Sequence, residues 1–89
     1  MASSDIRGVI REYLQDRFMI GKSPASLSDT DPLLEKGILD STGVLELVGF
    51  IEETFSFSVE DEELVPDNLG SVENLVRYVA RKAGRGVHN

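Results

Sequence analysis

An aspartate and a serine stand side by side at Asp40 and Ser41, where a loop gives way to an amphipathic segment. The apolar residues that follow recur with helical spacing and predict a helix from Ser41 to Phe55. In the first turn of this helix the serine hydroxyl would face solvent, beside backbone N–H groups that lack intrahelical partners. Because a helix N-terminus favours negative charge, the position suits an attached phosphate.

The same serine lacks the partners that would make it a catalytic nucleophile. A nucleophilic serine needs a general base within reach, and the only histidine, His88, lies at the C-terminal end. The chain holds no cysteine, and therefore has neither a disulfide framework nor a thiol of its own. It also lacks His or Cys clusters with metal-ligand spacing and a phosphate-binding glycine loop. We expect no catalytic residues, no metal and no enzymatic activity.

Charge is distributed very unevenly along the chain. The formal net charge is −7, and residues 37–76 contain ten acids but no lysine or arginine. Nucleic acids and anionic membranes need a cationic surface, so neither is expected as a partner. A basic protein surface is the natural partner, because opposite charge speeds encounter. The alternative is an acidic face that serves only solubility.

Four helices are expected around this site, and no alternating strand pattern competes with them. The predicted segments are 4–19, 41–55, 60–64 and 71–82. Ser3 or Ser4 can cap the first helix, and Gly21 is placed to end it. Pro66 would end the short third helix, and Ser71 would cap the fourth. These elements predict a small all-α four-helix bundle with a long loop between the first two helices.

The first, second and fourth of these helices each have one apolar face that is expected in the core. The expected core residues are Ile6, Val9, Ile10, Tyr13, Leu14 and Phe18; then Val44, Leu47, Val48, Ile51 and Phe55; then Val72, Leu75, Val76 and Val79. Loops as long as 22–39 are usually functional or held by packing. The residues expected to hold this one are Leu27, Leu33, Leu34, Ile38 and Leu39.

A length of 89 residues predicts one domain over residues 1–89, with its core at 4–82 and a flexible tail at 83–89. No signal peptide precedes the first helix, and no apolar run approaches the roughly 20 residues of a membrane span. We expect a cytoplasmic monomer without a membrane segment.

From Gly37 to Phe55 the chain resembles the acyl carrier protein family, the phosphopantetheine-binding carriers. The matching residues are Asp40-Ser41, 46–48, 52–55, Val59, Asp61-Glu62 and 68–75, so that the resemblance covers about residues 4–82. It implies that Ser41 receives a 4′-phosphopantetheine arm from coenzyme A through a separate transferase, which alone needs Mg²⁺. The arm would bring the thiol that this chain lacks and would carry acyl cargo as a thioester.

The resemblance also assigns roles to the neighbours of Ser41. Asp40 can cap the helix, and by resemblance it would lie near the metal and the transferase during loading. A docking face is expected at Thr42, Leu45, Glu46, Gly49, Glu52 and Glu53. Its glutamates would meet lysine or arginine on partner enzymes, around Leu45 as the apolar centre. Val59 is expected in the core, and a merely solvated acidic face is the alternative.

Several residues depart from the family pattern. Thr42 replaces the familiar leucine, and Gly43 and Gly49 each cost a helix roughly 1 kcal/mol against alanine. Phe50 is larger than usual and would reduce the space for a long acyl chain. Among the pathways of fatty-acid and lipid metabolism, these departures argue against the partners of general fatty-acid synthesis and favour an acyl carrier for a specialised lipid or secondary metabolite. A free-standing carrier is expected, because the sequence shows no linker or neighbouring module.

Two alternatives stay open. The first is an aminoacyl or peptidyl carrier, loaded by an adenylating ligase. The second is an unmodified acidic interaction module that binds a basic partner through the same helix. As a carrier, the protein would meet the transferase, a loading ligase and downstream synthesis enzymes with basic docking surfaces.

Overall fold

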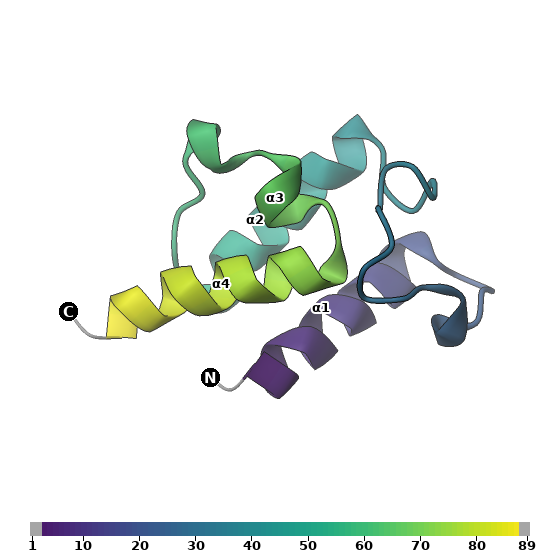
Figure 1. Ribbon diagram of the computed structural model, residues 1–89, viewed down its shortest axis with the longest axis horizontal. Helices are drawn as coiled ribbons and strands as arrows, with labels where there is room; N and C mark the ends of the chain where they lie inside the picture. The colour runs from purple at the N-terminus through teal and green to yellow at the C-terminus, as the bar shows by residue number, and fades with distance from the viewer. Residues whose placement is uncertain (1–2, 88–89) are drawn as a thin grey trace.

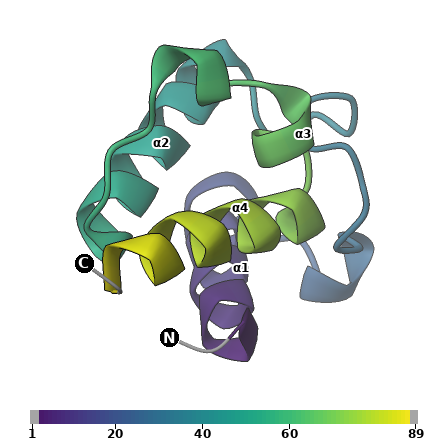
Figure 2. The same cartoon turned by 60° about the vertical axis from the view of Figure 1, so that its left-hand side comes forward.

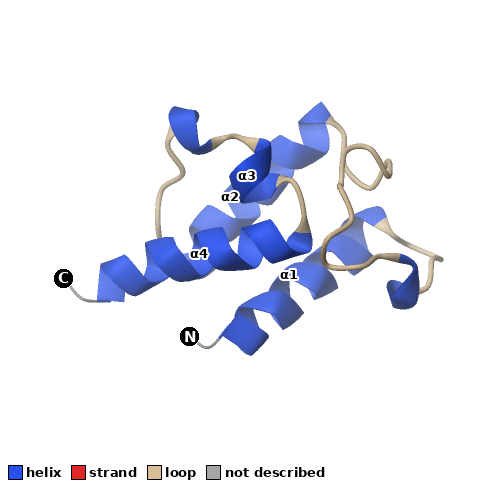
Figure 3. Cartoon of the chain, viewed as in Figure 1, coloured by secondary structure: helices blue, strands red, loops and turns tan. Residues whose placement is uncertain are grey.

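The computed structural model describes residues 3–87 and the side chains of residues 5–83. Its elements are α1 (Ser3–Phe18), α2 (Ser41–Phe55), α3 (Pro66–Leu69) and α4 (Val72–Val87), with the 3₁₀ turns η1 (Pro24–Ser26) and η2 (Asp61–Glu63). All regular structure in residues 3–87 is helical, without a strand (Figure 3). The predicted all-α four-helix bundle, with its long first loop and short third helix, is confirmed. No helix among these residues is long and apolar enough to cross a membrane.

The helices are arranged around α4 (Figure 1). It packs against α1 and α3 and also contacts α2. Turning the molecule shows α4 crossing in front of α1, with α3 above it (Figure 2). The deepest side chains come from all three long helices, and they include Ile10, Leu47 and Val79. Three core residues were not expected from the periodicity: Met19, Leu69 and the fully buried Tyr78 of α4.

The structure of α1 agrees closely with the prediction from the sequence. In α1, Ile6, Ile10 and Leu14 are buried, and the expected core residues Val9, Tyr13 and Phe18 pack half-buried against them. Gly21 follows the helix with a φ of +82°, a conformation that glycine adopts without steric cost. The caps predicted at Ser3 or Ser4 lie outside the described side chains.

The loop at 22–39 is held by leucine and isoleucine, with one exception. Leu27, Leu33, Ile38 and Leu39 are buried as predicted. Leu34 is 55% exposed, so its predicted burial is wrong. The backbone turns at this point, because the Leu33 carbonyl accepts the N–H groups of Ile38 and Leu39 at 3.0 and 3.2 Å. That turn directs Leu33 inward and leaves its neighbour outside.

The segment after α2 differs from the prediction. A helix was expected at 60–64 with Pro66 as its end, but η2 covers only Asp61–Glu63, and Pro66 begins α3. Proline suits the first position of a helix, since that residue's N–H would have no helical partner. Val65 before it is extended, with φ −131° and ψ 155°.

The last helix starts as predicted and runs further. The Ser71 hydroxyl oxygen accepts the Asn74 N–H at 3.2 Å, which confirms the expected cap. The helix continues to Val87, although a tail was predicted from residue 83. Gly84 and Gly86 weaken a helix by about 1 kcal/mol each, far less than a proline would. The end of the predicted tail, with His88, lies outside the described residues.

Candidate functional site

Ser41 occupies the first position of α2, and its side chain is exposed. Asp40 precedes it as the N-cap, and its Oδ1 accepts the Gly43 N–H at 2.7 Å. The expected capping role of Asp40 is therefore confirmed. Its side chain satisfies one of the free N–H groups of the helix start, and the Ser41 hydroxyl stays open to solvent.

The structure explains why position 43 is a glycine, which the sequence did not. It is buried beneath the end of α1. A Cβ at this position would lie 3.1 Å from a ring carbon of Phe18 and 3.3 Å from Asp40 Oδ1. Glycine thus lets α1 approach the first turn of α2 closely and leaves room for the Asp40 cap. Gly43 lowers the helix propensity of α2, but it allows the close packing that holds the start of the helix in place.

The predicted docking residues divide into two groups. Thr42, Leu45, Gly49 and Glu53 are exposed, and Leu45 shows 65% of its surface. No atom outside its own helix backbone and chain neighbours lies within 4 Å of a Cβ built on Gly49, so a partner can approach there.

The other two predicted docking residues already have partners within the chain. Glu46 is exposed but lies 3.4 Å from Arg17 Nη2 of α1. Glu52 is half-buried, and its Oε2 accepts the Val59 N–H at 2.8 Å. Val59 itself packs half-buried against the core, as expected. Glu52 therefore holds the chain that follows α2 as well as facing the surface.

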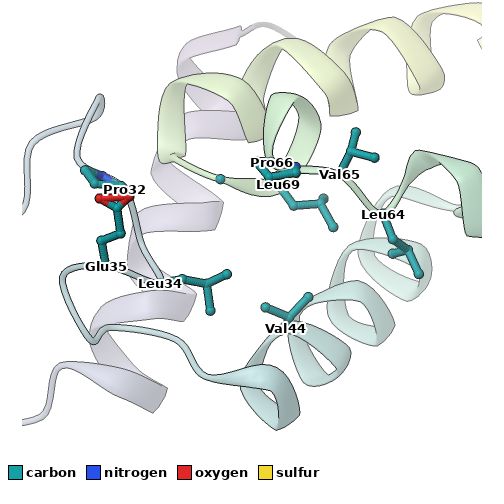
Figure 4. Close-up of a pocket in the computed structure, with 9 residues that line it drawn as sticks. Pro32, Leu34, Glu35, Val44, Leu64, Val65, Pro66 and Leu69 are labelled. Carbon is teal, nitrogen blue, oxygen red and sulfur yellow. The ribbon is translucent and has the colours of Figure 1, made fainter.

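An apolar pocket of about 260 Å³ lies beside α2, between the loop and α3. Its lining consists of Pro32, Leu34, Glu35, Val44, Leu64, Val65, Pro66, Leu69 and Gly70. Leu34, Val44 and Leu69 point toward a common space (Figure 4). Val44 is three residues from Ser41, so the pocket lies about one helical turn from its hydroxyl. A 150 Å³ apolar cavity holds benzene, and this pocket has room for a small acyl group.

Sequence reasoning missed the apolar surface around this pocket. Leu64 and Val65 are each 39% exposed, and Leu34 lies on the opposite side. Pro66 could have predicted their exposure, because a proline that starts a helix places the preceding residues in an extended linker. Phe50 was expected to limit cargo space, but it stacks on Tyr13 of α1 with ring centroids 4.0 Å apart. It does not line this pocket.

The loop side of the pocket is tied to α1 and α4 by an arginine cluster. Arg7 pairs with Asp29 and lies 3.1 Å from Glu73 Oε1. Arg11 Nη1 lies 2.7 Å from Asp29 Oδ1, and its Nη2 donates to the carbonyls of Pro24 and Leu27. Two arginine side chains of α1 therefore bind the Asp29 carboxylate, two carbonyls of the loop and the Glu73 carboxylate of α4.

The α3 side of the pocket is tied to α4 by Glu63. This carboxylate accepts hydrogen bonds from Glu60 N–H, Tyr78 Oη and Lys82 Nζ, with its Oε1 2.9–3.0 Å from each donor. The Glu60 N–H and then Lys82 and Tyr78 lower the pKa of Glu63 to about 2. Burial and the Glu63 carboxylate raise the pKa of Tyr78 above its usual value. Both groups therefore keep one charge state across the physiological range.

Among the described residues, no group of His, Cys, Asp or Glu side chains could hold a metal ion. The site offers instead an exposed hydroxyl at a helix start, a position that favours negative charge. The described surroundings of Ser41 contain no histidine that could serve as its base.

Comparisons with known proteins agree with this geometry. The family described as "Phosphopantetheine attachment site" matches residues 8–79, a stretch that includes Ser41. The chain is also similar to the "Probable acyl carrier protein PigG" of Serratia sp. (strain ATCC 39006). The two are 30% identical over 69 residues, which make up 78% of each chain.

Proposed function

The chain belongs to the acyl carrier protein family of phosphopantetheine-binding carriers, and from this premise we propose that Ser41 is the attachment site of its arm. The protein is a carrier and not an enzyme, and its cofactor is a covalently attached 4′-phosphopantetheine. The observation that carries the assignment is the place of Ser41, exposed at the first position of α2 and next to its cap, Asp40. When attached, the arm supplies a thiol that holds cargo as a thioester.

The residues around Ser41 would contribute position and not catalysis. The cap by Asp40 and the close contact of Gly43 with Phe18 hold the start of α2, so that the hydroxyl is presented in one place. We propose that Asp40 also lies near the metal ion of the transferase during loading. The transferase must supply the base, since the described surroundings of Ser41 provide none.

We propose small acyl groups as the cargo, in the synthesis of a specialised lipid or secondary metabolite. The apolar lining of the 260 Å³ pocket, one helical turn from Ser41, supports an acyl cargo of modest size. The name of the Serratia relative, a probable acyl carrier protein, points the same way. An aminoacyl cargo is the second candidate, because Glu35 places a carboxylate at the pocket rim that could face an ammonium group.

We propose that partners, among them the phosphopantetheinyl transferase, dock on the exposed face of α2. Leu45 supplies an apolar centre there, and Thr42, Glu46, Gly49, Glu52 and Glu53 surround it. A variant with Glu46→Lys and Glu53→Lys avoids the structural bond of Glu52. Its loading should slow most at low salt, where charge attraction reaches furthest. An unchanged rate would restrict the acidic face to solubility.

Intact mass after loading tests the attachment site. The apo protein is incubated with coenzyme A, Mg²⁺ and a broad-specificity phosphopantetheinyl transferase. We expect a gain of one phosphopantetheine mass in the wild type and in Ser58→Ala, which removes another exposed hydroxyl. Ser41→Ala should show no gain. A gain that persists in Ser41→Ala would place the attachment site elsewhere, and no gain in the wild type with several transferases would contradict the carrier function.

A further inference from the structure

The wall of the pocket on the α3 side is built from short elements. η2 has three residues and α3 has four, and helices this short have no stability of their own in water. Leu64 and Val65 connect them, and together with Pro66, the first residue of α3, they line the pocket. Their position must therefore be set by contacts with the rest of the molecule.

Glu63, the residue next to Leu64, provides several of those contacts, beside the buried Leu69 and the bond from Asn74 Nδ2 to the Pro66 carbonyl at 3.1 Å. Its Oε1 lies 3.0 Å from Lys82 Nζ and 2.9 Å from Tyr78 Oη, both on α4. Its backbone carbonyl accepts Asn68 Nδ2 at 2.9 Å, which adds a bond to α3. Glu63, at the end of η2, thus bonds to α3 and to α4, which lie after the pocket-lining segment in the chain.

The other acids of the run do not share this role. Glu60, Asp61 and Glu62 are exposed, whereas the side chains of Glu63 and Lys82 are only 21% and 13% exposed. A hydrogen bond between two charged groups with limited access to water is among the stronger ones in proteins. Lys82 Nζ is also 5.8 Å from the ring centroid of Phe57, and Phe57 packs edge-on against Tyr78. The network is therefore anchored in the core.

We propose that Glu63 is a positioning residue for cargo: it holds the segment 64–66 as a wall of the pocket and so determines how well a cargo acyl group is sheltered from solvent. The inference rests on the proposed function, because it takes the arm on Ser41 as the source of the cargo. When this carboxylate loses its partners, Leu64 and Val65 loosen, while Leu69 and the bond from Asn74 to Pro66 keep α3 against α4.

The test compares the reactivity of two loaded forms. Acetyl and hexanoyl arms are transferred to the protein from acetyl- and hexanoyl-coenzyme A, and cleavage of each thioester by hydroxylamine is followed by mass. If the hexanoyl group occupies the pocket nine-tenths of the time, its cleavage is about tenfold slower than that of the acetyl group. We expect this ratio to fall by roughly threefold or more in Glu63→Gln, which loses the charge-assisted bond.

Matched variants separate the network from a general effect on folding. Glu62→Gln removes an exposed neighbouring charge and should keep the wild-type ratio. Lys82→Met should lower the ratio like Glu63→Gln, and Lys82→Arg should restore it, because the cation is kept. A folded Glu63→Gln and a folded Lys82→Met with the wild-type ratio would overturn the proposal, as would equal cleavage of the two arms in the wild type.

Hydrogen exchange of the unloaded protein provides a readout that does not depend on the arm. In Glu63→Gln, the amides of Leu64, Val65 and Leu69 should exchange roughly tenfold faster than in the wild type, and they should stay faster than those of Leu75 and Val79 in the α4 core. Unchanged exchange at Leu64, Val65 and Leu69 would contradict a positioning role. If the wild type takes no arm at all, the proposed function fails, and the exchange rates still decide whether Glu63 holds the wall.

Discussion

The two walls of the pocket beside α2 are held in different ways. On the loop side, Leu33 lies between the lining residues Pro32 and Leu34; it is fully buried, and its N–H donates to the Gly70 carbonyl at 2.9 Å. On the α3 side, Leu64 and Val65 remain 39% exposed, and the Glu63 carboxylate next to them bonds to α4. The loop wall is attached through a buried leucine, whereas the exposed part of the α3 wall is attached through a polar network.

The difference indicates which wall can move without loss of the fold. Removing a buried leucine leaves a cavity in the core, so the loop wall is coupled to global stability. Breaking a hydrogen-bond network at the edge of the core costs less and acts locally. The proposed cargo pocket therefore has a fixed side and an adjustable side, and Ser41 lies on the helix between them.

The largest effect is expected from the loop wall. Leu33→Ala should lower the free energy of unfolding by about 2–5 kcal/mol, because it removes a fully buried side chain. Its neighbour provides the matched control, since Leu34→Ala changes an exposed side chain and should cost less than about 0.5 kcal/mol. Urea denaturation measures both. Equal costs would show that burial of Leu33 does not anchor the loop wall.

An intermediate, pH-dependent effect is expected from the α3 wall. At pH 7, Glu63→Gln should lower the free energy of unfolding by about 1–3 kcal/mol. The folded-state pKa of Glu63 is about 2, below its ordinary value of 4.5, so its contribution is present above pH 4.5 and is lost as the pH falls toward 2. The stability gap between wild type and variant should therefore close between these values. A gap that is independent of pH would show that the charge of Glu63 does not hold the wall.

The smallest effect is expected from the arginine cluster of the loop. Asp29→Asn weakens its pairs with Arg7 and Arg11, whose side chains are about one-third exposed. The cost should be about 0.5–1 kcal/mol and should decrease with added salt, as for partly exposed ion pairs. Thermal unfolding at low and high salt measures it. A loss as large as that of Leu33→Ala would mean that charge, and not leucine burial, anchors the loop wall.

The sequence predicted elements with strong local signals well. The bounds of α2, Ser41 and Phe55, agree with the structure, because a capping aspartate and a regular apolar face define them. The cap at Ser71 was predicted for the same reason. The turn near Pro66 was not, since proline can either end a helix or begin one. Whether Pro66 ends or begins a helix here depends on how the segment packs against α4.

Residues of the same type in neighbouring positions could not be distinguished. Leu33 and Leu34 have the same side chain, and only the turn in the backbone places one inside. Likewise, η2 contains three consecutive acids, and the phase of this short turn brings Glu63 to Lys82 and Tyr78. Among the expected docking acids, Glu52 gave no sign of its bond to Val59.

The sequence alone determined the chemistry available to this protein: one serine at a helix start beside a capping aspartate, an acidic surface, no cysteine and four amphipathic segments. Apart from the short third segment, these features are local, and the propensities of neighbouring residues are enough to define them. The tertiary structure decided the pocket, the close contact of Gly43 with Phe18 and the role of Glu63. Each depends on partners distant in sequence, Phe18 for Gly43 and Lys82 for Glu63, and such contacts exist only after the helices have packed.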